Sequence, residues 1–323
     1  MVPSPAEERP DVSVVIPVYK SQGTLPALLP RLESVLRSRQ EPFEVLLVND
    51  NGLDEAWAMI EDWASTRPWV RGMCLMRNYG QHNALLCGIR AARGSRIVTI
   101  DDDLQHPPEE IPKLLAKLEE GYDVVYGAAQ SQRHGLWRNL ASQVTKLVLR
   151  GAMGTETACQ VSAFRVFRST VEGAFRNYSG PFVCLDVLLT WGTTRFAAVP
   201  TRHEERYAGK SNYTFGKLVV HAMNMITGFS VMPLKLASLA GFLCTIFGLA
   251  VLGYVWGRYL IGGVSVPGFT FLASTITIFS GAQLFALGII GEYLARMHFR
   301  AMERPTYVVC QATFAGKDPH GRC

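Results

Sequence analysis

The sequence predicts an α/β domain with a mostly parallel sheet and flanking helices, followed by an interfacial amphipathic helix and two C-terminal transmembrane helices. Apolar, β-branched runs alternate with helical segments over residues 12–126, which is typical of right-handed βαβ units. The strand candidates lack polar/apolar alternation, as expected where helices cover both faces of a sheet. Two long uncharged runs in the last third of the chain predict the membrane helices.

The elements of the sheet domain follow from these runs in order. We predict strands at residues 12–18, 44–48, 71–75, 97–100 and 124–126, and helices at 25–37, 55–64, 82–92 and 109–119. Beyond them we expect an amphipathic helix at 136–150 and a strand at 195–199. Residues 215–232 form an amphipathic pattern directly before the first uncharged run, which favours a helix lying in the membrane interface.

The uncharged runs cover residues 236–257 and 259–291, and each is long enough to cross a hydrocarbon core. Gly262, Gly263 and Pro267 indicate a turn, so the second span is expected to begin near Phe269. This predicts a cytosolic domain at 1–213, a juxtamembrane helix at 214–232, a two-helix anchor at 233–296 and a cytosolic tail at 297–323.

The charge pattern predicts how the chain lies in the membrane. The loop between the spans holds only Arg258, whereas Arg296, Arg300 and Arg304 follow the second span. The first ten residues contain no apolar run typical of a signal peptide. We therefore expect an integral protein of the inner or plasma membrane with both termini cytosolic. A net charge of +5 is modest and does not suggest binding to nucleic acid.

The most informative stretch is the apolar run 97–100, which ends in Asp101, Asp102 and Asp103. On extended backbone the side chains of Asp101 and Asp103 would point the same way, and Asp102 to the opposite, structural side. Two carboxylates on one face suit a hard divalent cation that takes its other ligands from water and a diphosphate. The alternative is an acidic cluster that caps the next helix or solvates a loop.

Polar residues also follow the preceding strands. Asp50 comes after the second strand and could accept hydrogen bonds from a base or a ribose, or cap a helix. Arg77 comes after the third strand and could pair with phosphate, or remain a surface arginine. Ligands bind at the carboxyl ends of parallel strands, so these residues predict an active site there. The sequence has neither G-x-G-x-x-G nor a P-loop motif, which argues against a dinucleotide or P-loop kinase site.

Several motifs, taken in order, resemble family 2 glycosyltransferases with the GT-A (nucleotide-diphospho-sugar transferase) fold, and within them the polyprenyl-phosphate glycosyltransferases. They lie at residues 14–19, 49–50, 77–82, 101–109, 206–215, 291–296 and 304–305. The resemblance implies inverting transfer of a sugar from a UDP- or GDP-sugar to a polyprenyl monophosphate, for cell-envelope glycan or lipid modification.

The resemblance also implies roles for particular residues. On the donor side, Asp50 contacts the nucleobase, and Asp101 and Asp103, with Gln105 nearby, hold Mg²⁺ or Mn²⁺. Further substrate-binding positions on that side are Pro17, Tyr19, Arg77 and Gln81.

On the acceptor side, Arg206 and Lys210, with Ser211, stand where a lipid phosphate would arrive; the alternative is that they contact lipid headgroups. The family usually has an aspartate before Phe164, and here Glu156 is the nearest carboxylate. The expected catalytic residues are Asp103, Glu156 and Arg206.

Two alternatives to this function remain. A non-catalytic membrane scaffold or lipid-headgroup-binding protein could keep the same fold, although the intact aspartates argue against it. A processive polysaccharide synthase would carry Gln-x-x-Arg-Trp before its membrane helices, and that pentapeptide does not occur. Two spans are too few for a channel but could anchor a homo-oligomer.

Overall fold

The computed structural model describes residues 9–129, 161–180, 182–204, 232–262 and 268–314. The chain divides into two compact units, and each is described by itself. The first comprises residues 1–218 and 304–323, and the second residues 219–303. The last residues of the chain thus belong to the first unit.

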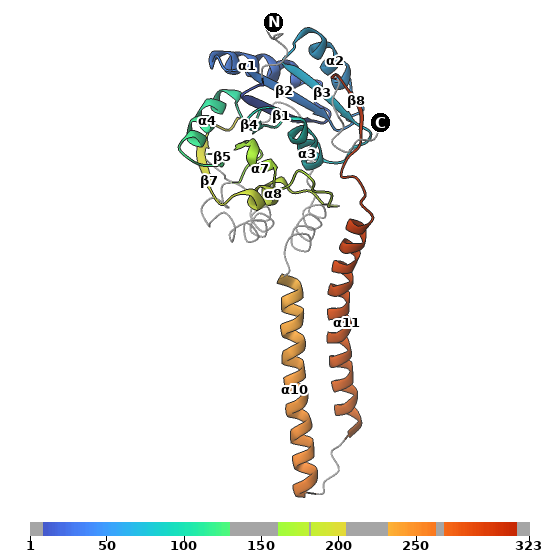
Figure 1. The fold of residues 1–323 in the computed structure, drawn as a ribbon. Coiled ribbons are helices and arrows are strands. Elements are labelled where there is room, and N and C mark those ends of the chain that lie inside the picture. The colour runs from blue at the N-terminus through green and yellow to red at the C-terminus, as the bar shows by residue number, and fades with distance from the viewer. Residues whose placement is uncertain (1–8, 130–160, 181, 205–231, 263–267, 315–323) are drawn as a thin grey trace. The chain divides into compact units, whose positions relative to one another are not determined.

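The first unit is built on one sheet with helices packed around it (Figure 1). Its described strands are β1 (Val12–Val18), β2 (Phe43–Asn49), β3 (Val70–Leu75), β4 (Arg96–Thr99), β5 (Val124–Ala129), β6 (Arg165–Arg168), β7 (Phe196–Thr201) and β8 (Val309–Ala312). They lie in the order β7-β5-β6-β4-β1-β2-β3-β8. β1 pairs in parallel with β2 and β4, and β2 with β3. β6 and β8 are antiparallel to their neighbours.

The described helical segments of the first unit are α1 (Leu25–Ser38), α2 (Ala56–Thr66), α3 (Gln81–Ala91), the 3₁₀ helix η1 (Pro108–Glu110), α4 (Ile111–Glu119), α7 (Ser169–Glu172) and α8 (Leu185–Gly192). α4 buries Ile111, Leu114, Leu115 and Leu118, which lie three and four residues apart on one face. All residues of β1 are buried, as expected of a central parallel strand.

The mostly parallel sheet predicted from the sequence is confirmed. The predicted strands and helices between residues 12 and 119 agree with the structure to within a few residues at their ends. One difference is that the predicted helix 109–119 begins as the separate segment η1, with proline at its start. The segments predicted as amphipathic helices at 136–150 and 215–232 lie outside the described residues, except for Met232, where α10 begins.

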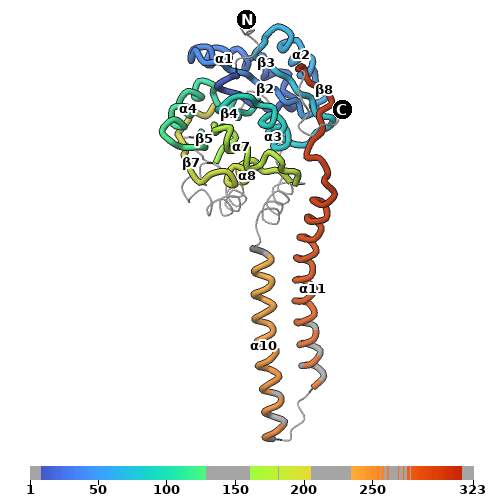
Figure 2. Tube along the Cα trace, in the orientation of Figure 1, coloured from blue at the N-terminus to red at the C-terminus, as the bar shows by residue number. Residues whose placement is uncertain are grey.

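The sequence did not predict β6 or β8. Each has only four residues, and all four of β8 are exposed, so neither forms a long apolar run. β8 extends the sheet beyond β3 with a segment from the far end of the chain (Figure 2).

A buried carboxylate ties β2 to its surroundings. Glu44 is 1% exposed, and it accepts hydrogen bonds from the Ser13 hydroxyl at 2.7 Å and from the Arg93 backbone N–H at 2.7 Å. The Arg71 guanidinium lies 2.8 Å from the same carboxylate. Burial alone would raise the pKa of Glu44, but these hydrogen bonds and the Arg71 charge together lower it below 4.5.

We predict that Glu44→Gln lowers the free energy of unfolding by about 1–3 kcal/mol at neutral pH, because the bonds to an ionised acceptor are lost. A carboxylate whose pKa is lower in the folded state stabilises the fold at pH values above its pKa in the unfolded state. That stabilisation is lost as pH falls through its pKa in the folded state. The difference between wild type and variant should therefore shrink below about pH 4. Denaturant unfolding at a series of pH values measures this, and a difference that does not change with pH would contradict it.

The second unit consists of two long helices, α10 (Met232–Gly262) and α11 (Gly268–Ala301). They contain apolar windows at Leu234–Tyr254 and Ile278–Ala301 that are long enough to cross a membrane, and neither window is buried within the protein. These windows overlap both predicted spans, and α11 begins at Gly268, next to the predicted start of the second span near Phe269. At Gly248 a Cβ would lie 3.2 Å from the ring of Phe279, so glycine allows the two helices to approach closely.

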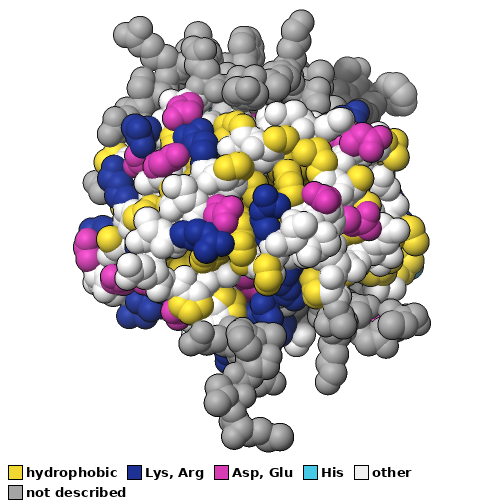
Figure 3. All heavy atoms as spheres, turned by 90° about the horizontal axis from the view of Figure 1, so that it is seen from above, with side chains coloured by type: hydrophobic (Ala, Val, Ile, Leu, Met, Phe, Trp, Pro, Cys, Tyr) yellow, Lys and Arg dark blue, Asp and Glu magenta, His cyan; other side chains and the backbone are white. Residues whose placement is uncertain are grey.

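The surface of the molecule carries both signs of charge. On the face that Figure 3 shows, lysine and arginine side chains are interspersed with aspartate, glutamate and hydrophobic ones. The described residues on that face therefore form no patch of a single sign of charge.

Candidate active site

The donor-side residues expected to bind substrate lie at or after the ends of four adjacent parallel strands. In the sheet, Val18 at the end of β1 lies beside Asn49 at the end of β2, and Asn49 beside Cys74 in β3. β4 runs parallel to β1 on its other side. The segments after these strands thus share one edge of the sheet, which we call the carboxyl edge, as the sequence predicted.

Residues with a positive φ angle concentrate at this edge. Residues with positive φ follow all four strands: Lys20 (57°), Asn51 (52°), Leu53 (56°), Gly80 (92°) and Leu104 (61°). Positive φ is uncommon outside glycine, and such residues concentrate at functional sites. A Cβ on Gly52 would lie 2.6 Å from the Lys20 backbone nitrogen, so the turns after β1 and β2 touch there.

The aspartate turn, residues 101–105, begins just after β4 ends at Thr99. Asp102 accepts hydrogen bonds from the Tyr19 backbone N–H at 3.2 Å and from the Ser21 hydroxyl. Asp101 accepts one from the Gln81 side-chain amide at 2.6 Å. Asp102 therefore has a structural contact with the turn after β1, as expected, but the predicted reason was wrong. The chain turns at Asp102 and Asp103, so alternation along a strand does not set the side-chain directions.

The carboxylates of the turn repel one another. Burial, followed by the charges of Asp103 and Asp102, raises the pKa of Asp101 to about 7. Burial also raises the pKa of Asp102 to about 6 against the opposing hydrogen bonds. Asp103 accepts a hydrogen bond from the Gln105 backbone N–H at 3.1 Å. A bound cation would stabilise the ionised carboxylates that burial disfavours.

The carboxylate oxygens of Asp101 and Asp103 suit a hard divalent cation that prefers oxygen ligands. Among the described residues, no three His, Cys, Asp or Glu side chains are grouped as a complete metal site. Asp101 and Asp103 would supply only carboxylate oxygens, leaving other positions to water and substrate. Mg²⁺ is usually held in this way, by one or two carboxylates together with substrate phosphates.

Asp50 lies at the end of β2 and is 2% exposed. One carboxylate oxygen accepts a hydrogen bond from the Tyr79 backbone N–H at 2.7 Å, and the other from the Gly80 N–H at 2.8 Å. Burial raises the pKa of Asp50, and the two N–H groups oppose that shift. Asp50 thus holds the loop between β3 and α3 against the end of β2.

The other donor-side residues lie around this loop. The Arg77 guanidinium is 4.6 Å from the centre of the Tyr79 ring, on the surface. Pro17 is buried within β1, whereas Tyr19 is 42% exposed beside the aspartate turn. The structure therefore gathers Asp50, Arg77, Gln81, Asp101 and Tyr19 along the carboxyl edge.

The acceptor-side residues Glu156, Arg206, Lys210 and Ser211 lie outside the described residues. The described residues nearest to them in the chain contact the aspartate turn and the residue after it. The Ser162 hydroxyl is 3.4 Å from His106 Nε2, and the Glu204 backbone N–H donates to the Gln105 carbonyl at 2.9 Å.

His106 packs at the point where these segments meet. Its ring stacks on Phe164 with centroids 5.3 Å apart, and the His203 ring lies 5.0 Å away. Burial, followed by the neighbouring His203, lowers the pKa of His106 to about 4, so the ring is neutral at pH 7. This is the environment of a packed histidine.

Sequence reasoning missed a buried ion pair behind the site. Arg165 of β6 is 2% exposed and pairs with Asp186 of α8, which also accepts a hydrogen bond from the Tyr126 hydroxyl at 3.1 Å. The Arg165 charge lowers the pKa of Asp101 against the larger effect of burial. The pairing could not be predicted because no local pattern links β6 to α8.

Comparison with known proteins places these features in a family. The model of the family described as glycosyl transferase family 2 matches residues 13–172. The undecaprenyl-phosphate 4-deoxy-4-formamido-L-arabinose transferase of Klebsiella pneumoniae is 32% identical over 306 residues, 92% of each chain. That of Salmonella choleraesuis is 33% identical over 314 residues, 95% of each chain.

Similarity to solved structures is more distant. Glucosyl-3-phosphoglycerate synthase from Mycobacterium tuberculosis, solved with Mn²⁺, UDP and phosphoglyceric acid, is 17% identical. The match covers 69% of this chain and 78% of that one, with a TM-score of 0.49.

Proposed function

The chain belongs to glycosyltransferase family 2, and we propose that it transfers a sugar from a nucleotide-diphosphate sugar to a polyprenyl monophosphate, with a divalent cation and with inversion at the anomeric carbon. The observation that carries the proposal is the pair Asp101 and Asp103 at the carboxyl edge. It occurs in a chain that matches proteins named undecaprenyl-phosphate transferases over more than nine-tenths of their length. The 4-deoxy-4-formamido-L-arabinose of those names is the first candidate for the sugar.

Asp101 and Asp103, with Gln105 beside them, would hold Mg²⁺ or Mn²⁺. When bound, the cation neutralises charge on the departing nucleoside diphosphate, so that group needs no proton. Gln81 orients Asp101 through its amide hydrogen bond of 2.6 Å. Asp102 fixes the turn itself, through its bonds to the turn after β1.

The nucleotide would lie along the ends of β1, β2 and β3. Each carboxylate oxygen has two lone pairs, so Asp50 retains acceptor capacity for a base or a ribose beyond the N–H groups of Tyr79 and Gly80. Arg77 is exposed at the same edge, where it can pair with phosphate. Pro17 and Tyr19 complete this side.

The acceptor would enter beside Glu156, Arg206, Lys210 and Ser211. A phosphate monoester is mostly ionised near neutral pH, with a second pKa of about 6, so positioning it matters more than deprotonating it. A lipid acceptor also accounts for α10 and α11, which we propose anchor residues 233–296 in the inner or plasma membrane with both termini in the cytosol.

The test is mass spectrometry of the lipid product. The full chain in lipid nanodiscs is incubated with undecaprenyl phosphate, Mg²⁺ or Mn²⁺ and a panel of UDP- and GDP-sugars. We expect a single class of undecaprenyl-phosphate sugar, formed only with one nucleotide sugar and a divalent cation. Absence of a lipid-linked sugar across the whole panel, including UDP-4-deoxy-4-formamido-L-arabinose, would contradict the proposal.

A further inference from the structure

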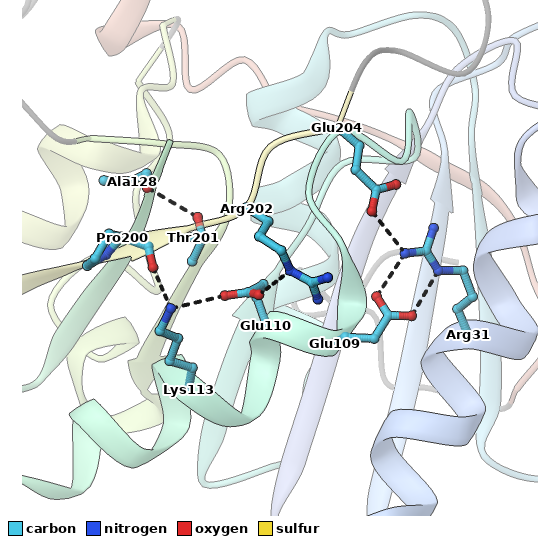
Figure 4. A network of polar contacts seen from close by, with 9 residues as sticks. All are labelled: Arg31, Glu109, Glu110, Lys113, Ala128, Pro200, Thr201, Arg202 and Glu204. Carbon is cyan, nitrogen blue, oxygen red and sulfur yellow. Dashed lines mark hydrogen bonds and ion pairs between the residues drawn. The ribbon is translucent and has the colours of Figure 1, made fainter. Parts of the chain in front are cut away.

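We infer that a network of ion pairs around η1 positions the end of β7 on the aspartate turn, and that Arg31 and Arg202 are therefore positioning residues for the acceptor. Its members, which we call the η1 network, are Arg31, Glu109, Glu110, Lys113, Arg202 and Glu204 (Figure 4). The part that concerns the acceptor rests on the function proposed above.

One half of the network joins α1 to η1 and to the segment after β7. The Arg31 guanidinium meets Glu109 with two hydrogen bonds, of 2.9 and 2.8 Å. The same guanidinium lies 3.6 Å from the Glu204 carboxylate. A two-point contact fixes the orientation of both partners, so Arg31 can hold Glu109 and Glu204 together.

The other half joins η1 and α4 to β7. Glu110 is 8% exposed, and it accepts a hydrogen bond from Arg202 at 2.8 Å and one from Lys113 at 3.3 Å. Lys113 also donates to the Pro200 carbonyl at 2.6 Å, while Thr201 donates to the Ala128 carbonyl at 3.3 Å. The last residues of β7 are thus held by side chains from two neighbouring elements.

The network lies next to the aspartate turn in sequence and in space. Glu109 and Glu110 follow that turn within a few residues, and the Glu204 N–H donates to the Gln105 carbonyl at 2.9 Å. Arg206, the expected phosphate ligand, is two residues beyond Glu204. Two residues of fully extended chain span about 7 Å, so the Cα atoms of Glu204 and Arg206 are no farther apart than that. The contact between Glu204 and the aspartate turn therefore limits the distance between Arg206, where the acceptor-side segment begins, and the carboxylates of Asp101 and Asp103.

Stability alone gives little reason for the arginines of this network, because Arg31 and Arg202 are 32% and 62% exposed and ion pairs of exposed side chains contribute little. The first unit also offers a matched comparison at the opposite end of β7. Arg195 forms a two-point pair with Asp123, at 2.9 and 2.8 Å, with side-chain exposures of 66% and 11%. Arg202 and Glu110 have nearly the same exposures, 62% and 10%, but only their pair lies beside the aspartate turn.

The experiment compares Arg31→Gln, Arg202→Gln and the double variant with the control Arg195→Gln, each as the full chain in nanodiscs. Hydrogen exchange by mass spectrometry follows peptides over residues 103–107 and 200–204. Steady-state kinetics use undecaprenyl phosphate and the nucleotide sugar that the panel identifies, and Mn²⁺ binding is measured separately.

We expect the double variant to lose exchange protection in both peptides and to raise KM for undecaprenyl phosphate by about tenfold to a hundredfold. KM for the nucleotide sugar and the affinity for Mn²⁺ should change far less. Arg202→Lys should lose less exchange protection than Arg202→Gln. Arg195→Gln should leave the protection of both peptides and both KM values as in wild type.

Unchanged protection in the double variant would overturn the inference whatever the protein transfers. Lost protection with an unchanged KM for the lipid, or with equal changes in both KM values, would overturn its acceptor part. If the wild type forms no lipid-linked sugar, the proposed function fails, and the exchange data still decide whether the network holds β7 on the turn.

Discussion

Replacing Asp103 by asparagine should lower the rate of sugar transfer by about 10²–10³-fold or more, the loss seen when one charge-stabilising group is removed from an active site. The reason is the loss of one of only two carboxylates that we propose for the cation. Asparagine keeps the size of the side chain and can still accept the hydrogen bond that Asp103 accepts from Gln105. The measurement combines turnover with Mn²⁺ binding, which should weaken in parallel.

A suitable control for this variant is Asp62→Asn, which removes an exposed carboxylate from α2. It should leave turnover and Mn²⁺ binding unchanged. Wild-type turnover in Asp103→Asn would remove Asp103 from the mechanism. Weakened turnover with unaltered Mn²⁺ affinity would assign it a role other than metal binding.

Replacing Arg165 by methionine should lower the free energy of unfolding by about 3–5 kcal/mol, because it leaves the Asp186 carboxylate buried without its charged partner. The Tyr126 hydroxyl still donates to Asp186 but carries no positive charge. Thermal unfolding of the first unit, followed by near-ultraviolet circular dichroism, measures the loss. At roughly 2–4 °C per kcal/mol for a domain of this size, the midpoint should fall by at least about 6 °C.

Two further variants test this explanation. Arg165→Met combined with Asp186→Leu should recover most of the stability, since replacing a buried pair by apolar residues is often neutral. Arg195→Gln should cost only about 0–1 kcal/mol, because Arg195 is 66% exposed and Asp123 keeps the Thr193 hydroxyl and Arg168 as partners. A single Arg165→Met variant as stable as Arg195→Gln would show that burial of this pair has no energetic consequence.

The sequence predicts the fold well where its signals are local. The apolar runs that form β1 to β5 are separated by turns and helices of ordinary length. The spacing of hydrophobic residues and the local composition are therefore enough to predict these strands. β8 has no such signal, because its four residues are exposed and its partner β3 lies more than 200 residues earlier. β6 is equally short, and its antiparallel pairing with β4 follows only from the folded sheet.

The candidate site is predictable in position but not in geometry. Parallel strands put Asp50, Arg77 and Asp101 on one edge, which the sequence alone could infer. The direction of each aspartate depends instead on a turn with Leu104 at positive φ and on the distant partners Ser21 and Gln81. The pairs of Arg31 with Glu109 and of Arg165 with Asp186 are likewise products of the fold, because no sequence period connects them.

The most direct test of the central claim measures release of nucleoside diphosphate by the full chain under four conditions, with and without Mn²⁺ and with and without undecaprenyl phosphate. Transfer to a lipid phosphate at a metal-assisted donor site predicts rapid release only when both are present, and its loss in Asp103→Asn. Release that needs neither the cation nor the lipid phosphate, or that persists in the variant, would contradict the account.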